Sequence, residues 1–336
     1  MSTISFSTAQ LKKEAERLFC HLKSLSWSYD DCLTYAPLTL EINTLKRQRH
    51  AVLLAHSYQT PDIVYGVADF TGDSYGLSVE AKKTDASVIV FCGVRFMAET
   101  AKILNPKKRV LLPAPDAGCS LADSITAADV RILKKKHPGV PVVCYVNTAA
   151  EVKAESDVCV TSANALKIIE ALQGKKIIFI PDKLMAANLA MLTHKEIISW
   201  NGTCVVHERF DVAQLRAQRH EHPGLKILAH SECNSDIMKE ADLMGGTTDI
   251  LRTVKNSRDR DFMIVTECGL VDRLRSEFPE KRFLGTCNLC PFMKKNTLRN
   301  IRQVLLKPRK DQVVEIPETV RKKAERALER MFELNK

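Results

Sequence analysis

Long apolar segments and a secretion signal are both missing from this sequence of 336 residues. A membrane-spanning helix needs about 18 or more consecutive apolar residues, and no window of the chain reaches that length. The first residues, MSTISFSTAQLKKEAERLF, do not show the charged stretch followed by an apolar stretch that a secretory signal requires. We therefore expect a cytoplasmic protein with no membrane partner.

Aromatic residues are also scarce, at 6% of the chain, and they are not interleaved with the basic residues. The net charge is +10, but the basic residues are spread along the chain. A nucleic-acid groove combines a basic track with aromatic side chains that stack on bases, so we expect no nucleic-acid partner. Small anionic substrates suit the positive charge at least as well.

Cysteine, by contrast, is abundant, with eleven copies. The number is odd and nothing indicates secretion, so we do not expect a disulfide framework. Cys92 and Cys144 lie in or at the end of apolar runs, where cysteine behaves as a small hydrophobic residue. The segment GTCNLCPFMKKNTLRN, residues 285–300, holds Cys287 and Cys290 as a C-x-x-C pair. Such a pair can be half a zinc site, a redox dithiol, part of an iron–sulfur ligand set, or without function.

After an N-terminal stretch, the chain alternates strand-like apolar runs with helix-like segments, which predicts an α/β fold with parallel sheets covered by helices. The candidate strands are 51–56, 87–93, 109–113, 140–147, 176–181, 202–207, 225–230, 261–267 and 282–285. Both ends of the chain are expected to be helical from the spacing of their apolar residues. These residues are Leu11, Ala15, Leu18 and Leu22 at one end, and Ala324, Leu328, Met331 and Leu334 at the other.

Three strands of this pattern share one layout, in which an apolar run ends in two polar residues that are two positions apart. The pairs are His56/Tyr58, Tyr145/Asn147 and His230/Glu232. Their first members are separated by 89 and then 85 residues. Three cysteines keep nearly the same period: 85 residues separate Cys119 from Cys204, and 86 separate Cys204 from Cys290. The chain therefore reads as three copies of a unit of roughly 85 residues.

In open α/β sheets, ligands gather beyond the carboxyl ends of the strands. If the three copies pack around a pseudo-threefold axis, the polar strand ends and the three cysteines converge at one point. Three thiolates with one open position fit an iron–sulfur cluster that has one iron free to bind substrate. A catalytic zinc ion with three cysteines is a weaker alternative. Taken by itself, the C-x-x-C segment also allows a thioredoxin-like dithiol.

Several longer strings make the chain resemble the quinolinate synthases. They are AHSYQTPDIVYGVADFTGDS (55–74), VIVFCGVRFMAETAKILNP (88–106), PDAGCSLADS (115–124), CYVNT (144–148), TSAN (161–164), GTCVVHERF (202–210), LAHSEC (228–233), GGTTDI (245–250) and CPFMKKNTL (290–298). Some positions depart from the common family pattern: Ser231 stands where proline is usual, and Cys268 stands where glycine is more common. Ser57 lies at a position that varies in the family.

The resemblance implies three αβα domains of similar topology around a pseudo-threefold axis. On this basis we expect an N-terminal helical extension (1–45), three αβα repeats (46–136, 137–222 and 223–310) and a C-terminal helix (311–336), with the C-terminal region closing repeat one. It also implies a reaction in which iminoaspartate and dihydroxyacetone phosphate condense to quinolinate, with loss of phosphate and two waters. An aspartate-oxidising enzyme is the possible source of the iminoaspartate.

The resemblance further assigns the functional residues. A 4Fe–4S cluster is held by Cys119, Cys204 and Cys290, with Cys287 as a neighbour. Cys290 is preferred because it directly precedes the string PFMKKNTL. The residues implied to bind substrate are His56, Ser74, Tyr145, Asn147, Ser162, His230 and Thr247.

Loss of a hydroxyl as water needs a Lewis acid on the oxygen and a base on a neighbouring proton. Tyr58 and Glu232 are the candidates for the proton transfers. Plainer interpretations remain: such strand-end residues can be hydrogen-bonded core residues, and Ser74 can simply cap a helix. For His207 and Arg209 the sequence allows either a supporting place beside the site or a plain surface position. A non-enzymatic iron–sulfur or zinc-binding regulator with a basic surface is the alternative function.

Overall fold

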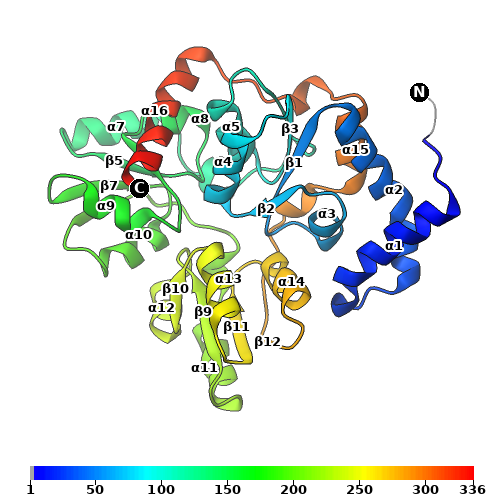
Figure 1. Ribbon diagram of the computed structural model, residues 1–336. Coiled ribbons are helices and arrows are strands. Elements are labelled where there is room, and N and C mark those ends of the chain that lie inside the picture. Colours follow the sequence, from blue (N-terminus) through cyan, green and yellow to red (C-terminus); the bar gives the residue numbers. More distant parts are fainter. Residues whose placement is uncertain (1–3) are drawn as a thin grey trace.

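Three parallel β-sheets of four strands each form the framework of this computed structural model, which describes residues 4–336. The strand orders are β2-β1-β3-β4, β6-β5-β7-β8 and β10-β9-β11-β12, so all three sheets have the same topology. Every pairing between these strands is parallel. The predicted α/β fold with three similar αβα domains is therefore confirmed (Figure 1).

Along the chain the same order of elements occurs three times, and each of these repeats ends in a cysteine-bearing loop followed by a helix. The first contains β1 (Ala51–His56), α3 (Pro61–Gly66), β2 (Phe70–Gly72), α4 (Ser74–Lys83), β3 (Val88–Cys92), α5 (Arg95–Leu104), β4 (Arg109–Leu111), α6 (Ser120–Asp123) and α7 (Ala127–Lys136). The second contains β5 (Val142–Tyr145), α8 (Ala150–Ala154), β6 (Val158–Val160), α9 (Ala165–Ala171), β7 (Lys176–Ile180), α10 (Lys183–Ala190), β8 (Glu196–Ser199), the 3-10 helix η2 (His207–Arg209) and α11 (Val212–Glu221). The third contains β9 (Lys226–His230), α12 (Ser235–Glu240), β10 (Leu243–Gly245), α13 (Thr247–Asn256), β11 (Asp261–Val265), α14 (Cys268–Glu277), β12 (Arg282–Leu284), η3 (Met293–Lys295) and α15 (Leu298–Leu306).

One predicted strand, at residues 202–207, is wrong. Only Gly202 makes a bridge, to Asp182, and the chain then turns into η2. The place beside β7 is already taken by β8, which pairs with β7 from Lys176↔Glu196 onward. The strands β2, β6, β8 and β10 were not predicted. They are only three or four residues long, too short to show an apolar pattern of their own.

The central strands are buried because helices cover both faces of each sheet. All four residues of β5 are buried, and so are the last four of β1, β3, β7, β9 and β11. Phe179 of β7 and Phe262 of β11 are fully buried, on the equivalent strands of the second and third domains. Burial of each such side chain stabilises the fold by about 1.5–3 kcal/mol.

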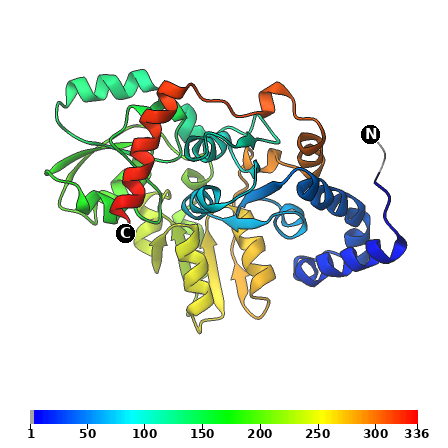
Figure 2. The same cartoon turned by 45° about the horizontal axis from the view of Figure 1, so that its top comes forward.

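The three domains contact one another in a cycle. Helix α5 of the first domain packs against α8 of the second, α10 of the second packs against α12 of the third, and α14 of the third packs against α3 of the first. In each case the helix that follows the third strand meets the helix that follows the next domain's first strand. This cyclic packing is the pseudo-threefold arrangement predicted from the 85-residue period (Figure 2).

The N-terminal helices, α1 (Thr8–Leu22) and α2 (Tyr29–Gln48), pack together at the edge of the first domain, joined by η1 (Lys23–Leu25) (Figure 1). Each begins with a serine capping box, at Ser7 and at Ser28. Ala15, Leu18 and Leu22 of α1 are buried, as their spacing predicted, whereas Leu11 is only partly buried. Helix α2 also contacts β1, so the extension lies against the first domain. Helix α15 packs there too, because Ile301 and Val304 share a core cluster with Leu53 of β1.

The C-terminal helix α16 (Glu318–Leu334) follows η4 (Lys310–Gln312) and crosses two domains. It packs against α5 of the first domain and against α8, α9 and β6 of the second. Ala324, Leu328 and Met331 are buried in this contact, and Leu334 is half-buried. The prediction of a covering C-terminal helix is therefore correct. Among the described residues, no helix is long and apolar enough to cross a membrane.

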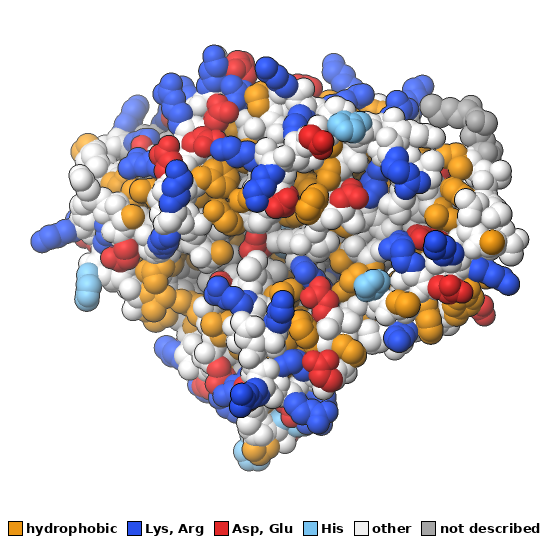
Figure 3. All heavy atoms as spheres, viewed as in Figure 1, with side chains coloured by type: hydrophobic (Ala, Val, Ile, Leu, Met, Phe, Trp, Pro, Cys, Tyr) orange, Lys and Arg blue, Asp and Glu red, His pale blue; other side chains and the backbone are white. Residues whose placement is uncertain are grey.

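The surface carries charges of both signs. On the face shown in Figure 3, basic and acidic side chains are interspersed and hydrophobic side chains lie between them. Ion pairs such as Lys82–Glu329, at 2.7 Å, connect elements that are far apart in sequence. The basic side chains are thus not gathered into one patch on this face.

Candidate active site

One cavity lies where the three domains meet, and all twelve predicted site residues line it. They are His56, Tyr58, Ser74, Cys119, Tyr145, Asn147, Ser162, Cys204, His230, Glu232, Thr247 and Cys290. The cavity encloses about 710 Å³ of space not filled by atoms, counting the part that opens to solvent. Each domain contributes strand ends, a helix start and one cysteine to its wall, so the sequence period correctly predicted that these residues come together.

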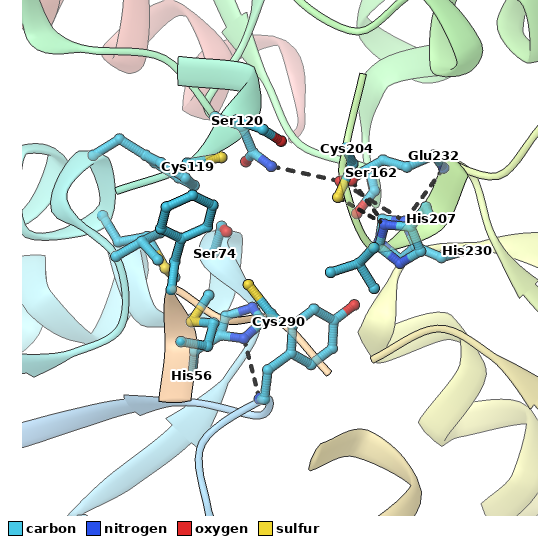
Figure 4. Close-up of a pocket in the computed structure, with 18 of the residues that line it drawn as sticks. His56, Ser74, Cys119, Ser120, Ser162, Cys204, His207, His230, Glu232 and Cys290 are labelled. Carbon is cyan, nitrogen blue, oxygen red and sulfur yellow. Dashed lines mark hydrogen bonds and ion pairs between the residues drawn. The ribbon is translucent and has the colours of Figure 1, made fainter. Parts of the chain in front are cut away.

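The three cysteines reach the cavity from equivalent loops. Cys119 directly precedes α6. Cys204 lies three residues before the first residue of η2, and Cys290 lies three residues before the first residue of η3. Figure 4 shows their sulfur atoms facing one central space. All three are free thiols. Burial raises the pKa of each thiol, to about 12 for Cys119, so a metal must displace the protons in order to bind.

This donor set fits the predicted 4Fe–4S cluster. Three thiols from three separate loops are soft ligands, and they surround a shared space instead of forming disulfides with one another. A second group of possible ligands, Cys204, His207 and Glu232, has ligand atoms within 4.8 Å of one another. In that group His207 Nδ1 and Glu232 Oε2 lie 2.9 Å apart and interact with each other, so these two ligand atoms already have a partner.

The other cysteine of the C-x-x-C pair has a different partner. Cys287 forms a disulfide with Cys268, the first residue of α14, a pairing that the sequence did not predict. Cys268 is the residue that departs from the glycine of the family pattern. The disulfide joins the N-terminus of α14 to the loop that carries Cys290, and it leaves Cys290 free.

Two histidines have the same local geometry in the first and third domains. The backbone N–H of Tyr58 donates to His56 Nδ1 at 3.2 Å, and the backbone N–H of Glu232 donates to His230 Nδ1 at 3.3 Å. Because Nδ1 is an acceptor, Nε2 carries the proton of each neutral ring. Burial lowers the pKa of His56 to about 3 and that of His230 to about 4, so both rings are neutral at pH 7. Each can therefore donate one hydrogen bond from Nε2.

A continuous hydrogen-bond network connects the two predicted proton-transfer residues. Glu232 Oε2 interacts with His207 Nδ1 at 2.9 Å, and His207 Nε2 interacts with the Thr266 hydroxyl at 2.8 Å. The Thr266 hydroxyl lies 2.8 Å from the Tyr58 hydroxyl. At the far end of the network, the Tyr145 hydroxyl donates to Glu232 Oε1. The network thus joins all three domains across the cavity.

The pKa values of the two predicted proton-transfer residues, Tyr58 and Glu232, are shifted in opposite directions. Burial raises the pKa of Tyr58 well above its usual value, so the phenol holds its proton at pH 7. For Glu232, burial would raise the pKa, but the neighbouring His207 and His230 and the hydrogen bonds from His207 and Tyr145 outweigh it. The net shift lowers the pKa of Glu232, and the carboxylate is ionised.

Three hydroxyl groups lie at another part of the wall. Ser74 and Thr247 are the first residues of α4 and α13, where backbone N–H groups are not used within the helix. Asp73, and not Ser74, caps α4 by accepting from the Gly76 N–H at 2.8 Å, so the capping interpretation of Ser74 is wrong. Ser162 lies so close to Gly246 that a Cβ there would approach its Oγ to 2.6 Å.

Sequence reasoning missed two members of the network. His207 had no assigned role, although it stands three residues after Cys204, and Thr266 was not considered. Thr266 directly follows β11, so its position at a strand end was a signal that could have been used. Their importance comes from contacts between domains, which no local pattern reveals.

The chain is similar to known proteins over almost its whole length. The family model described as quinolinate synthetase A protein matches residues 40–333. Quinolinate synthase 2 of Mesorhizobium japonicum is 49% identical over 332 residues, which cover 99% of each chain. Quinolinate synthase of Sinorhizobium fredii is 45% identical over 327 residues, 97% of this chain and 90% of the relative. That of Xylella fastidiosa is 49% identical over 288 residues, 86% of this chain and 84% of the relative.

Proposed function

The chain belongs to the quinolinate synthase family, and we propose that it condenses iminoaspartate with dihydroxyacetone phosphate to form quinolinate for NAD biosynthesis. The reaction releases one phosphate and two waters. The observation that carries the proposal is a cavity between the three domains that is lined by all twelve residues predicted for this chemistry. The cytoplasm is its proposed location, and an aspartate-oxidising enzyme is the proposed source of the unstable imine.

Cys119, Cys204 and Cys290 are the proposed ligands of a 4Fe–4S cluster. When bound, the cluster supplies an iron with an open position, which acts as a Lewis acid on an oxygen that leaves as water. The three thiols need no help from Cys287, because that residue is engaged with Cys268.

The substrate anions are proposed to bind at the hydroxyl-lined part of the wall. Ser74 and Thr247 can donate hydrogen bonds, and the N-termini of α4 and α13 favour negative charge. Ser162 completes this group from the second domain. His56 and His230 donate from Nε2 as neutral rings, so they can bind oxygen atoms of the substrate without fixing a full positive charge there.

Tyr58 is the proposed acid–base group at the reacting carbons, and the network carries its proton. The phenol can pass a proton to the Thr266 hydroxyl, which in turn can donate to His207 Nε2. The ionised Glu232 accepts from His207 Nδ1 and stabilises the imidazolium that results. Thr247 donates to the Tyr58 oxygen at 3.2 Å and would stabilise the negative charge left behind.

An anaerobic assay tests this function. Protein loaded with iron and sulfide is mixed with freshly generated iminoaspartate and dihydroxyacetone phosphate, and quinolinate and phosphate are measured by mass spectrometry and a phosphate assay. We expect the two products in equal amounts. The Tyr58→Phe variant, prepared in the same way, controls for contaminating enzyme. Cluster-loaded wild-type protein that forms no quinolinate would contradict the proposal.

A further inference from the structure

The loop that carries Glu232 is held by a side chain from a different domain. Asn188 lies in α10 of the second domain, and its Nδ2 donates to the backbone carbonyls of Ser231 and Cys233, at 2.9 Å and 2.7 Å. These two carbonyls belong to the residues immediately before and after Glu232. The amide of Asn188 therefore fixes the backbone of the residue before and the residue after Glu232, whose carboxylate accepts from His207.

The contact between Asn188 and the Glu232 loop is buried. Asn188 has no exposed area, and Glu232 is only 4% exposed. The orientation of the amide follows from its partners, because two carbonyl oxygens can accept only from the nitrogen. Asn188 Oδ1 is buried and has no hydrogen-bond partner among the described residues. An unpaired buried oxygen costs stability, and an apolar residue of similar size would avoid that cost.

The other two pairs of neighbouring domains also have a side chain of one domain that hydrogen-bonds to the strand-end loop of the next. Arg273 stands six residues after the N-cap of α14, as Asn188 does in α10, and it donates from Nη1 to the Ser57 hydroxyl at 3.0 Å. Ser57 directly precedes Tyr58. In α5, Glu99 Oε2 accepts from the Ala150 N–H at 2.9 Å, just beyond the Tyr145–Asn147 strand end. Each domain thus holds the reactive loop of the next through the helix that follows its third strand.

We propose that Asn188 is a positioning residue for Glu232. It touches neither cluster nor substrate, since it does not line the cavity, and it acts by keeping the Glu232 carboxylate in contact with His207 and Tyr145. The inference rests on the proposed function, because it assumes that Glu232 takes part in catalysis. A shift of about 1 Å in a reacting group is enough to lower a rate on the order of a hundredfold.

The test compares Asn188→Ala with a matched control, Gln312→Ala. Gln312 is also fully buried and its Nε2 donates to the Pro113 carbonyl at 2.9 Å, but it lies away from the cavity. For Asn188→Ala we expect kcat to fall about tenfold to a hundredfold, KM to change by less than about threefold, and iron and sulfide content to stay at the wild-type level. Gln312→Ala is expected to unfold at a lower temperature but to keep the wild-type kcat.

A double-mutant cycle separates positioning from a general loss of structure. In the Glu232→Gln background, Asn188→Ala should lower kcat by less than about threefold, because the residue it acts through is already disabled. Additive effects of the two changes, or a kcat of Asn188→Ala within about twofold of wild type, would overturn the proposal. If Asn188→Ala does not fold, Asn188→Ser, which keeps one donor, takes its place with the same expectations.

A crystal structure of the Asn188→Ala variant tests the positioning role independently of turnover. We expect the distance from Glu232 Oε2 to His207 Nδ1 to exceed 3.5 Å, compared with 2.9 Å in the wild-type chain. An unchanged distance would contradict the positioning role. If wild-type protein makes no quinolinate, the proposed function fails, and this distance still shows whether Asn188 holds Glu232.

Discussion

At the scale of single residues, Tyr58 has an unusual environment for a phenol. Its hydroxyl has two hydroxyl neighbours, Thr266 at 2.8 Å and Thr247 at 3.2 Å, and burial raises its pKa. A buried phenol of raised pKa is a poor acid by itself. The contact with Thr266 and His207 gives its proton a path to a group that can accept it.

We predict that Tyr58→Phe and Thr266→Val each lower turnover on the order of a hundredfold or more, the usual scale for a lost acid–base group. Both variants should retain the fold and a full complement of iron and sulfide. Thr266→Ser keeps the hydroxyl and serves as the control, with turnover near that of wild type. Steady-state kinetics on anaerobic preparations measures all three. Near-normal turnover of both Tyr58→Phe and Thr266→Val would remove the proton path from the mechanism.

The buried histidines predict how stability depends on pH. His56 and His230 have folded-state pKa values of about 3 and about 4, below the usual 6.5. From pH 6.5 down to these folded-state values, the unfolded chain therefore binds more protons than the folded chain. The free energy of unfolding must therefore fall as the pH drops below 6.5. Between pH 7 and pH 5 we expect a loss on the order of 2 kcal/mol for each histidine.

Urea unfolding of the metal-free protein at pH 7, 6 and 5 measures this loss. The double variant His56→Gln/His230→Gln lacks both groups and should show a much smaller change over the same range. If wild type and double variant lose the same stability, other groups must cause the pH dependence.

Some residues of the site could be predicted from the sequence and others could not. The pairs His56/Tyr58 and His230/Glu232 and the three cysteines could be predicted because they recur at a fixed period. Thr266 and Asn188 could not, since their effect depends on hydrogen bonds to residues of other domains. The roles proposed for the site residues stay predictions until variants are measured.

At the scale of elements, the start of α14 sets the distance between the third domain and Tyr58. A Cβ on Gly269 would lie 2.7 Å from backbone atoms of Tyr58. Lys294 adds a second contact, with its Nζ donating to the Tyr58 carbonyl at 2.6 Å and pairing with Glu267 at 3.0 Å. Glu267 in turn accepts from the Cys290 N–H at 3.1 Å. The Tyr58 loop and the Cys290 loop are therefore held by one set of side chains.

We predict that Gly269→Ala lowers both the unfolding temperature and turnover, because the backbone of Tyr58 must move to admit a methyl group. Gly72→Ala is the matched control: its added Cβ would meet nothing closer than 3.8 Å, so it should behave like wild type. Thermal unfolding and steady-state kinetics on both variants test the prediction. A Gly269→Ala protein as stable and active as Gly72→Ala would show that α14 does not set the position of Tyr58.

The elements themselves were predictable where they are long or strongly apolar. The central strands β1, β5 and β9 stood out because helices bury both of their faces, which requires an unbroken apolar run. The three-residue strands β2, β6 and β10 carry too few residues for such a run. The segment 202–207 looked like a strand because it is apolar, but Val206 and His207 are buried in a turn beside the cavity.

At the scale of the whole molecule, the site exists only because the three domains close on one another. Every domain supplies one cysteine and one strand-end pair to the same cavity, and the helices α5, α10 and α14 each hold the next domain. Helix α16 ties the first domain to the second. The period of about 85 residues predicted this convergence, whereas the residue limits of the domains stay a prediction.

Iron and sulfide analysis of four cysteine variants tests most directly whether the three domains jointly hold one cluster. The variants are Cys119→Ala, Cys204→Ala, Cys290→Ala and, as the matched control from the same C-x-x-C pair, Cys287→Ala. We predict that the first three lose the cluster and its broad absorption near 400 nm, while Cys287→Ala retains both, because Cys287 pairs with Cys268 and not with the metal. A full cluster in any of the first three variants, or its loss in Cys287→Ala alone, would contradict the account.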